Sequence, residues 1–231
     1  MTTAVVADAH IGGPGGPAGP LIEQLVALPA QGCERLVLLG DLFQVWVGYP
    51  AFTTPEIEAV AAALAELRGT GVEVDYVEGN RDFYLRGGRW AETFDRLALE
   101  MAFVAGGRRF LAVHGDGLDE GDVQYRLWRR LSKSLPVRLL VRSLPRRLAR
   151  RFVYSTERQL ASTNFKHKVR IPRDAILRYG EQRLAEGHDV LLLGHFHEAH
   201  CWPVSGGEVW LLDAWFRSRC VEWPGRGSPC A

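Results

Sequence analysis

The sequence predicts an α/β protein in which two stacked mixed β-sheets are flanked by helices. Three observations support this class: short apolar runs of strand length, helix-like segments between them, and a residue able to bind a metal at the end of each main run. The chain has 231 residues, 47% hydrophobic and 24% charged, and can bury one sizeable core. We expect a single domain over residues 1–231 with a helical insertion at about 120–170.

Five apolar runs are short enough to be buried strands. They cover residues 4–7, 36–39, 72–77, 110–113 and 190–193. Two later runs, residues 209–212 and 220–223, are also expected to form strands. Helices are expected at residues 54–69, where Thr54 can cap the helix and Pro55 suits its first turn, and from about residue 173 to 186.

Metal-binding residue types stand at the end of all five main runs. They are Asp8, His10, Asp41, Asn80, His114, His195 and His197. Because open α/β sheets place their chemistry at the carboxyl ends of strands, we expect these side chains to lie together. A glycine adjoins the ligand in four of the five blocks, and glycine lets the backbone approach a bound ion or phosphate closely.

The mixture of ligand types indicates which metals could bind. Carboxylate, amide and imidazole ligands together suit borderline divalent ions such as Mn²⁺, Fe²⁺, Co²⁺ or Zn²⁺. Seven ligands exceed what one ion of four to six ligands needs, so we expect two divalent ions, with Mn²⁺ the favoured one and Asp41 bridging them. Two ions about 3.5–4 Å apart would activate a water molecule and orient a phosphoryl group for in-line attack.

The five blocks resemble those of the calcineurin-like metallophosphoesterases, in the same order along the chain. Each block alone is a weak signal, whereas five in series at strand ends are specific. The blocks are Asp8-Ala9-His10, Gly40-Asp41, Gly79-Asn80-Arg81-Asp82, His114-Gly115-Asp116 and Gly194-His195-Phe196-His197.

Finer features are similar to one branch of that superfamily, the UDP-2,3-diacylglucosamine pyrophosphatases of lipid A biosynthesis. These features are Gly40-Asp41-Leu42-Phe43 followed by Trp46 and Gly48, Phe83 after the third block, the pair Asp122 and Tyr125, and Ala214-Trp215. The chain departs from the branch at Tyr49-Pro50, where acidic residues are common, and in the glycine- and proline-rich stretch from residue 12 to 20.

The resemblance implies roles for individual residues. One ion would be held by Asp8, His10, Asp41 and His197, and the other by Asp41, Asn80, His114 and His195. Asn80, Arg81 and His114 would belong to the catalytic centre. Substrate contacts would come from Arg81, Asp122 and Tyr125, with Ser162, Lys166 and Lys168 as candidates that the motif does not match one by one.

Arg81 bears on the type of bond that is cleaved. Related phosphatases carry a histidine in this position, which can protonate a leaving alkoxide. Arginine stays protonated but can bind a diphosphate through its fork of donors, and a phosphate leaves without protonation. Arg81 therefore favours a pyrophosphate bond, with a structural Arg81–Asp82 ion pair as the alternative. No G-x-S-x-G or Cys-His signature indicates a covalent nucleophile.

Positive charge is concentrated between the fourth and fifth blocks. From Arg126 to Arg151 there are ten Lys or Arg residues and no acidic residue, while the rest of the chain has 18 basic and 27 acidic residues. An insertion here can cover the metal site as a lid without disturbing the sheet. Its apolar residues recur at helical intervals, and Pro136 and Pro145 divide it into short helices.

Three interpretations of this basic segment stay open. It could be a solvated helix packed on the core by its leucines. Nucleic-acid binding is the weakest interpretation, because leucine and valine rather than aromatic residues alternate with the charges. An amphipathic cap on an anionic membrane fits best, since each Lys or Arg near such a surface contributes about 1 kcal/mol and the leucines can reach the acyl chains.

The sequence favours a cytoplasmic location. No apolar run reaches the roughly 18 residues that a membrane span needs, and the N-terminal run carries two ligands rather than a signal pattern. Wide spacing predicts free thiols in a reducing cytosol for the cysteines, which are Cys33, Cys201, Cys220 and Cys230.

The ligand pattern predicts a hydrolase, and the basic segment favours a peripheral position on the inner membrane. The resemblance implies that it cleaves UDP-2,3-diacylglucosamine to UMP and 2,3-diacylglucosamine 1-phosphate. Its expected partners are the UDP-linked acylated sugar and the anionic inner-membrane surface, with no nucleic acid and no obligate protein partner. One alternative is a metallophosphoesterase that acts on other nucleotides or phosphodiesters. A second alternative is a non-catalytic scaffold of the same fold.

Overall fold

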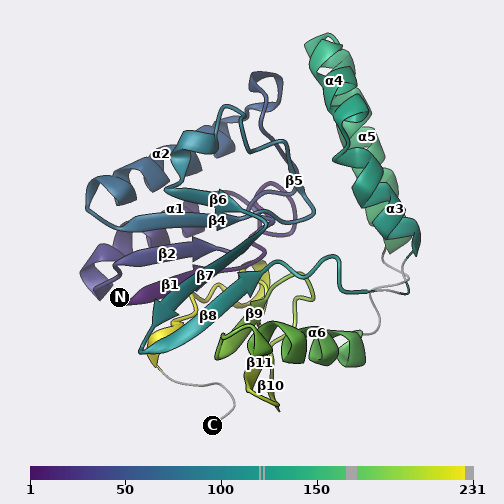
Figure 1. Ribbon diagram of the computed structural model, residues 1–231. Helices are drawn as coiled ribbons and strands as arrows, with labels where there is room; N and C mark the ends of the chain where they lie inside the picture. Colours follow the sequence, from purple (N-terminus) through teal and green to yellow (C-terminus); the bar gives the residue numbers. More distant parts are fainter. Residues whose placement is uncertain (120, 122, 165–170, 227–231) are drawn as a thin grey trace.

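The computed structural model describes residues 1–119, 121, 123–164 and 171–226. Helices and sheets lie in four layers, with the two sheets stacked face to face in the middle (Figure 1). This arrangement confirms the predicted fold class. It differs in one respect, because the first sheet is purely parallel and only the second is mixed.

The first sheet has four strands in the order β1-β2-β4-β6. Their bounds are Thr3–Val6, Arg35–Leu38, Glu73–Val77 and Arg96–Ala98. The second sheet has five strands in the order β10-β11-β9-β8-β7. In that order their bounds are His200–Val204, Gly207–Leu211, Val190–Leu193, Arg108–Val113 and Glu100–Ala105. A small parallel pair joins β3 (Trp46–Val47) to β5 (Asp82–Phe83).

Alternation along the strands explains why both faces of each sheet are buried. In β2, Val37 points into the core between the sheets, whereas Leu36 and Leu38 point to the outer core under the helices. In β9, Leu192 faces the central core and Leu191 the opposite one. Strands that are buried on both faces consist of continuous apolar residues, which is the pattern of the predicted runs.

Helices cover the two outer faces. The first sheet is covered by α1 (Gly19–Ala27) and α2 (Pro55–Gly69), and the second by α6 (Arg173–Ala185). The Thr54 hydroxyl accepts a hydrogen bond from the Ile57 amide at 3.3 Å, as expected for the cap of α2. The remaining short helices are α7 (Trp215–Ser218), η1 (Pro29–Gln31), η2 (Pro50–Phe52), η3 (Ala91–Thr93) and η4 (Pro224–Arg226).

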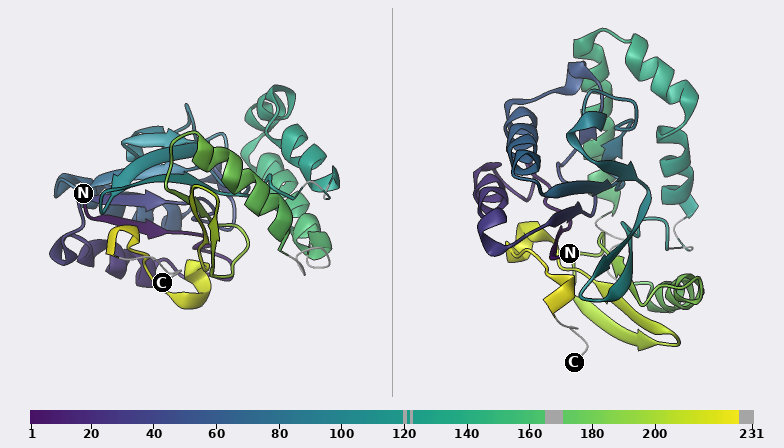
Figure 2. Two further views of the ribbon diagram at one scale, coloured as in Figure 1. Left: turned by 60° about the horizontal axis from the view of Figure 1, so that its bottom comes forward. Right: turned by 60° about the vertical axis from the view of Figure 1, so that its left-hand side comes forward.

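The basic segment forms three helices that stand to one side of the sheets (Figures 1 and 2). We call them the arm; they are α3 (Val123–Ser132), α4 (Leu135–Ser143) and α5 (Arg146–Asn164). Pro136 lies in the first turn of α4 and Pro145 precedes α5, as predicted, although α5 is 19 residues long rather than short. An apolar contact joins the arm to the body, where Val141 and Ala149 pack with Val47 and Phe52.

Two expectations from the sequence are wrong, and several elements were not expected. Residues 220–223 form no strand, since only an isolated bridge pairs Val5 with Glu222. The sequence did not predict the strands β3, β5, β6, β7 and β10 or the helices α1 and α7. Cys33 and Cys220 are free thiols as expected, whereas Cys201 is disulfide-bonded. Within the described ranges, no helix combines the length and apolar character that crossing a membrane requires.

Candidate metal centre

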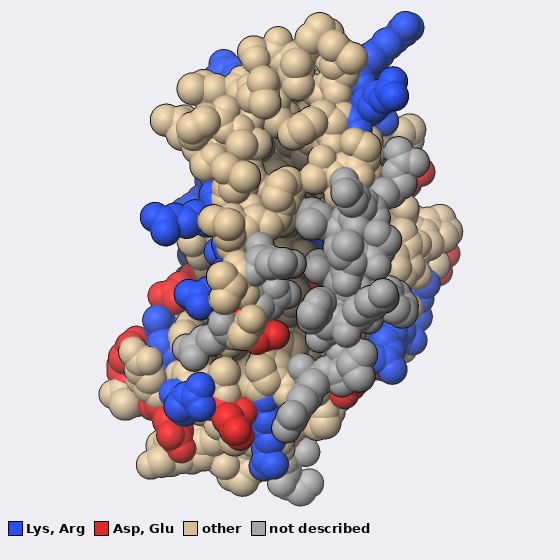
Figure 3. All heavy atoms as spheres, turned by 90° about the vertical axis from the view of Figure 1, so that its right-hand side faces the viewer, with Lys and Arg blue, Asp and Glu red and all other residues tan. Residues whose placement is uncertain are grey.

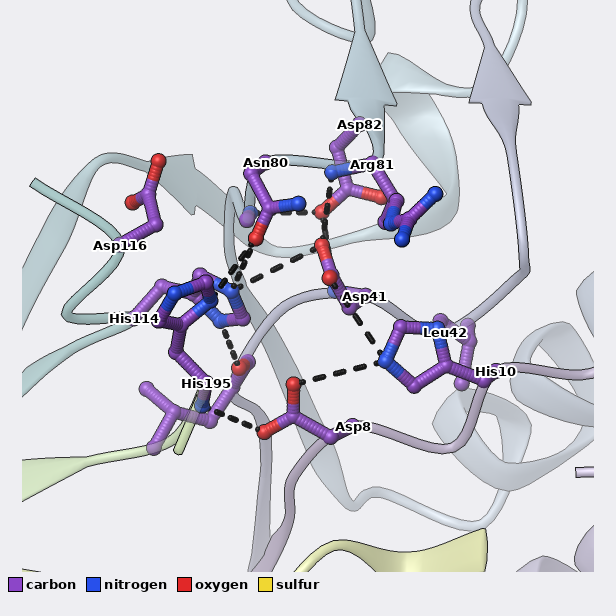
Figure 4. A network of polar contacts seen from close by, with 12 residues as sticks. Asp8, His10, Asp41, Leu42, Asn80, Arg81, Asp82, His114, Asp116 and His195 are labelled. Atoms are coloured by element: carbon purple, nitrogen blue, oxygen red, sulfur yellow. Dashed lines mark hydrogen bonds and ion pairs between the residues drawn. The ribbon is translucent and has the colours of Figure 1, made fainter. Parts of the chain in front are cut away.

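All seven predicted ligand residues gather at the carboxyl ends of five strands. Figure 4 shows six of them converging on one point, from loops that follow β1, β2, β4, β8 and β9. The strands β1, β2 and β4 are parallel to one another, and so are β8 and β9, so their ends meet at a common edge of the two sheets. The fold therefore brings together residues that are up to 189 positions apart, from Asp8 to His197.

Asp8, His10 and His197 form the first group. One ligand atom from each lies within 4.8 Å of the others. The Asp8 Oδ1 atom is 3.3 Å from His197 Nε2 and 3.7 Å from His10 Nε2. The other oxygen, Oδ2, accepts a hydrogen bond from the His195 amide at 2.8 Å, which fixes the orientation of the carboxylate.

Asn80, His114 and His195 form the second group. The Asn80 Oδ1 atom is 3.1 Å from His114 Nε2 and 3.0 Å from His195 Nδ1. The opposite ring nitrogen of His114, Nδ1, lies 2.9 Å from the Leu39 carbonyl oxygen, which can only accept. In the neutral ring Nδ1 is therefore the donor, and Nε2 presents a lone pair to the centre.

Asp41 lies between the two groups. Its Oδ2 atom is 3.7 Å from His10 Nε2, and its Oδ1 atom is 3.7 Å from His114 Nε2. Asp8, Asp41 and His114 also form a second set of ligand atoms within 4.8 Å of one another. The position of Asp41 is the one expected of a bridging ligand.

Buried polar atoms without hydrogen-bond partners indicate that a cation belongs here. Among the described residues, Asp8 Oδ1 and both ring nitrogens of His10 are buried and have no hydrogen-bond partner. Leaving such atoms unsatisfied costs about 1–3 kcal/mol each. Carboxylate and imidazole atoms are the donors that borderline divalent metals prefer, so the residues present fit divalent metal ions.

The protonation states of two candidate ligands, His10 and Asp8, also suit metal binding. Burial lowers the pKa of His10 to about 4 despite Asp41 and Asp8 nearby, so this ring is neutral at pH 7. Burial alone would raise the pKa of Asp8, but His114 and His197 together hold it well below its usual range. Neutral imidazole and ionised carboxylate are the forms that bind metals.

The backbone of the ligand loops is unusual. Asp8, His10, Asp41, His195 and His197 all have φ between 48° and 68°, the left-handed region. Glycines next to the ligands are required for space: a Cβ on Gly194 would lie 2.6 Å from Asp8 Oδ2, and one on Gly40 would lie 2.6 Å from His114 Nδ1. Glycine at these two positions therefore leaves the space that the side chains of Asp8 and His114 occupy.

Asp82 holds two of the ligand loops together. Its Oδ2 atom accepts hydrogen bonds from the amides of Gly79 at 2.6 Å and Asp41 at 3.2 Å, and from the Tyr76 hydroxyl at 2.9 Å. Burial, followed by the charge of Asp41, raises the pKa of Asp82 to about 7. The Arg81 amide in turn donates to Asp41 Oδ1 at 2.8 Å. Sequence reasoning considered Asp82 only as a partner of Arg81 and missed this contact with the loops.

The predicted substrate-side residues are only partly described. Tyr125 lies on α3 with its ring centroid 6.3 Å from that of His195, at the rim of the centre. Asp122, Lys166 and Lys168 lie outside the described residues, as does the side chain of Ser162. Asp116, Arg129 and Lys133, which sequence reasoning did not assign, join α3 to this rim.

Comparison with known proteins gives the family. No protein-family model matches the chain. A UDP-2,3-diacylglucosamine hydrolase from Ralstonia nicotianae is 31% identical over 227 residues, which cover 91% of this chain and 82% of the relative. A protein of the same name from Yersinia pseudotuberculosis is 32% identical over 199 residues, covering 81% of both chains.

Solved structures that resemble the chain include a single-residue variant of Vps29 from Entamoeba histolytica. It is 16% identical, the match covers 100% of this chain and 79% of that one, and the TM-score is 0.46. The family assignment rests on the sequence relatives, which agree with the motifs and with the gathered ligands. The chain is a hydrolase and belongs to the family of UDP-2,3-diacylglucosamine hydrolases.

Proposed function

We propose that this protein hydrolyses the diphosphate bond of UDP-2,3-diacylglucosamine. Water would attack one phosphorus atom, the bridging P–O bond would break, and the products would be UMP and 2,3-diacylglucosamine 1-phosphate. The observation that carries this proposal is the convergence of seven ligand-type residues at one edge of the sheets. The chain is also 31% identical, over 227 aligned residues, to a relative named UDP-2,3-diacylglucosamine hydrolase.

Two divalent ions, with Mn²⁺ as the proposed species, would polarise the phosphoryl group and activate the attacking water. Two of the proposed ligands are in the form that binds metal, because His10 is neutral and Asp8 is ionised at pH 7. Asn80 and His114 complete the catalytic centre in this proposal. Arg81 is joined to Asp41 through its amide, and its guanidinium would bind the diphosphate.

An apolar pocket between the arm and the body supports an acylated substrate. Its walls come from both parts: Val47 and Phe83 from the body, and Trp128, Val137 and Phe152 from the arm. Binding of hydrocarbon against apolar walls is favourable by about 25 cal/mol per Å² of apolar surface that is removed from water. These apolar walls suit hydrocarbon better than a nucleotide, and the cavity volume of about 40 Å³ admits a short part of an acyl chain.

The arm also has the composition of a membrane-surface element. Figure 3 shows its face toward the viewer, with a broad tan surface and Lys and Arg side chains at its margins. Large apolar side chains of the arm are exposed, namely Val123, Leu127, Leu131, Leu135, Leu139, Leu140, Leu148 and Phe152. We propose peripheral binding to the cytoplasmic face of an anionic inner membrane, because exposed leucines beside basic residues favour such surfaces.

Product analysis on four substrates tests the proposal. The substrates are UDP-2,3-diacylglucosamine, UDP-glucosamine, a dinucleotide polyphosphate and bis-p-nitrophenyl phosphate. We expect UMP and the acylated sugar phosphate from the first, with a higher kcat/KM than for the others. Preference for the dinucleotide would instead assign a nucleotide hydrolase, and no turnover of any substrate with Mn²⁺ would assign a scaffold.

A further inference from the structure

One face of α3 carries polar residues at regular four-residue spacing. Tyr125, Arg129 and Lys133, the last just beyond the helix end, follow one another at this interval. Residues four apart on a helix lie on the same side. Leu127 and Leu131 between them are exposed to solvent, whereas Tyr125, Arg129 and Lys133 contact the body.

Asp116 is the body's partner for two of these residues. Its side chain is 5% exposed and it follows His114 by two positions. The Tyr125 hydroxyl donates to Asp116 Oδ2 at 2.9 Å. The Arg129 guanidinium pairs with both carboxylate oxygens, through Nε to Oδ2 and through Nη2 to Oδ1 at 3.4 Å.

Lys133 makes the third contact, with a different ligand loop. Its Nζ atom donates to the Gly79 carbonyl oxygen at 2.7 Å. Gly79 directly precedes Asn80, and Asp116 closely follows His114. The polar face of α3 therefore contacts the loops that carry His114 and Asn80. The Nε2 atom of His114 lies 3.1 Å from the Oδ1 atom of Asn80.

The structure assigns to Asp116 the role of a positioning residue that sets the orientation of α3, and of Tyr125 with it, over the metal centre. This inference rests on the proposed function, in which the apolar pocket between the arm and the body receives part of an acyl chain of the substrate. Correct orientation of α3 would place that pocket beside the bond that is cleaved. The apolar contact of α4 and α5 with the body holds the arm in place but is not directional.

The choice of a charged pair at this position supports a role in orientation. A buried ion pair adds little net stability, because desolvation offsets the attraction, and apolar residues of the same size would hold a helix equally well. A carboxylate that receives two donors in fixed directions instead defines one geometry. Removing either partner of such a pair leaves the other uncompensated, so the effect of a substitution is large and measurable.

Three variants test the role of Asp116: Asp116→Asn, Arg129→Gln and the double variant. The readouts are KM and kcat for the diacylated substrate, Mn²⁺ affinity by calorimetry, and amide hydrogen exchange of α3. We expect KM to rise about tenfold with a smaller change in kcat, and α3 to exchange faster. The double variant should have about the same KM and the same exchange of α3 as either single variant, because both substitutions remove the same interaction. Mn²⁺ affinity should stay within about twofold, since neither residue is a ligand.

Arg126→Gln is the matched control, because Arg126 lies on the same helix and is exposed. Its KM, metal affinity and hydrogen exchange should equal those of the wild type. Unchanged exchange and unchanged KM in Arg129→Gln would overturn the inference, and so would loss of Mn²⁺ binding as the main effect of Asp116→Asn. Hydrogen exchange and Mn²⁺ binding need no substrate, so they test the role of Asp116 even where the wild type leaves UDP-2,3-diacylglucosamine intact.

Discussion

Asp41 faces His10 with one carboxylate oxygen and His114 with the other, at 3.7 Å in both cases. The two histidines belong to different ligand groups and to loops that follow strands of different sheets. A single carboxylate therefore spans the interface between the two halves of the sandwich. This relationship makes Asp41 the most informative candidate ligand to change.

Asp41→Asn should remove metal binding and activity together. The amide keeps the shape of the side chain but loses the charge and one acceptor oxygen, so we expect a fall in kcat/KM of more than about a hundredfold. Metal content by mass spectrometry and circular dichroism of the fold are the measurements. Chelator-treated wild type should regain activity with Mn²⁺; full turnover by the chelated wild type would contradict a metal-dependent site.

Arg81→Ala should lower kcat/KM on a pyrophosphate substrate by about 10²-fold, because a charge-assisted contact with the diphosphate is lost. Arg81→His should recover relative activity on esters with poor leaving groups, since histidine can donate a proton near neutral pH. Rates on UDP-2,3-diacylglucosamine and on an alkyl phosphodiester are compared for the three proteins. Equal losses on both substrates would show that Arg81 has no part in choosing the leaving group.

The charges and the leucines of the arm should have separable effects. Replacing Arg146, Arg147 and Arg151 by Gln should weaken binding to anionic vesicles, each arginine contributing about 1 kcal/mol. Salt should weaken it too, since surface charge is screened beyond about 8 Å at physiological ionic strength. Arg129 is left unchanged in this experiment because it is paired with Asp116.

Replacing Leu127, Leu131 and Leu148 by Ser should instead raise KM for the diacylated substrate and spare a short, water-soluble UDP analogue. These three side chains are exposed, so the fold should survive, which circular dichroism checks. Vesicle flotation and KM are measured for both triple variants. Wild-type protein that ignores anionic vesicles and prefers the deacylated analogue would identify the arm as a packed helical cover.

Gly194→Ala should disrupt the metal centre through space alone. The added Cβ would lie 2.6 Å from Asp8 Oδ2, the oxygen that accepts from the His195 amide, so Asp8 must move. We expect Mn²⁺ affinity to fall by about 10–100-fold, as for loss of an orienting contact. Gly69→Ala is the control: nothing lies within 4 Å of its Cβ at the end of α2, and stability should stay equal or rise by up to about 1 kcal/mol.

The clustering of the candidate ligands could be predicted from the sequence, because each of them lies shortly after the end of a buried strand. His114 and His195 each follow a continuous apolar run, and a run of that kind reads as a buried parallel strand. The alternation in β7 was overlooked: Met101, Phe103 and Ala105 are buried while the residues between them are exposed. Its period of two is a readable signal of a half-buried strand.

Contacts across the chain could not be predicted in the same way. Asp116 reads as part of a His-Gly-Asp block, and only the position of α3 shows that it receives Tyr125 and Arg129. Likewise, Tyr49-Pro50 departs from the branch, yet the structure stacks Tyr49 on Tyr84 and places its hydroxyl 3.2 Å from Arg138 of the arm. The contacts of Asp116 with α3 and of Tyr49 with Arg138 both depend on the position of the arm, which no local sequence pattern predicts.

The left-handed backbone of the candidate ligand loops lowers the stability of the fold at positions that metal binding requires. A non-glycine residue in this conformation costs about 1–2 kcal/mol, and five of the seven ligand residues adopt it. Glycine at any of these five positions would relax the chain while deleting a ligand. Laboratory selection for heat resistance alone should therefore drift toward inactive variants at these positions, and a useful stabilised enzyme would have to be sought elsewhere in the chain.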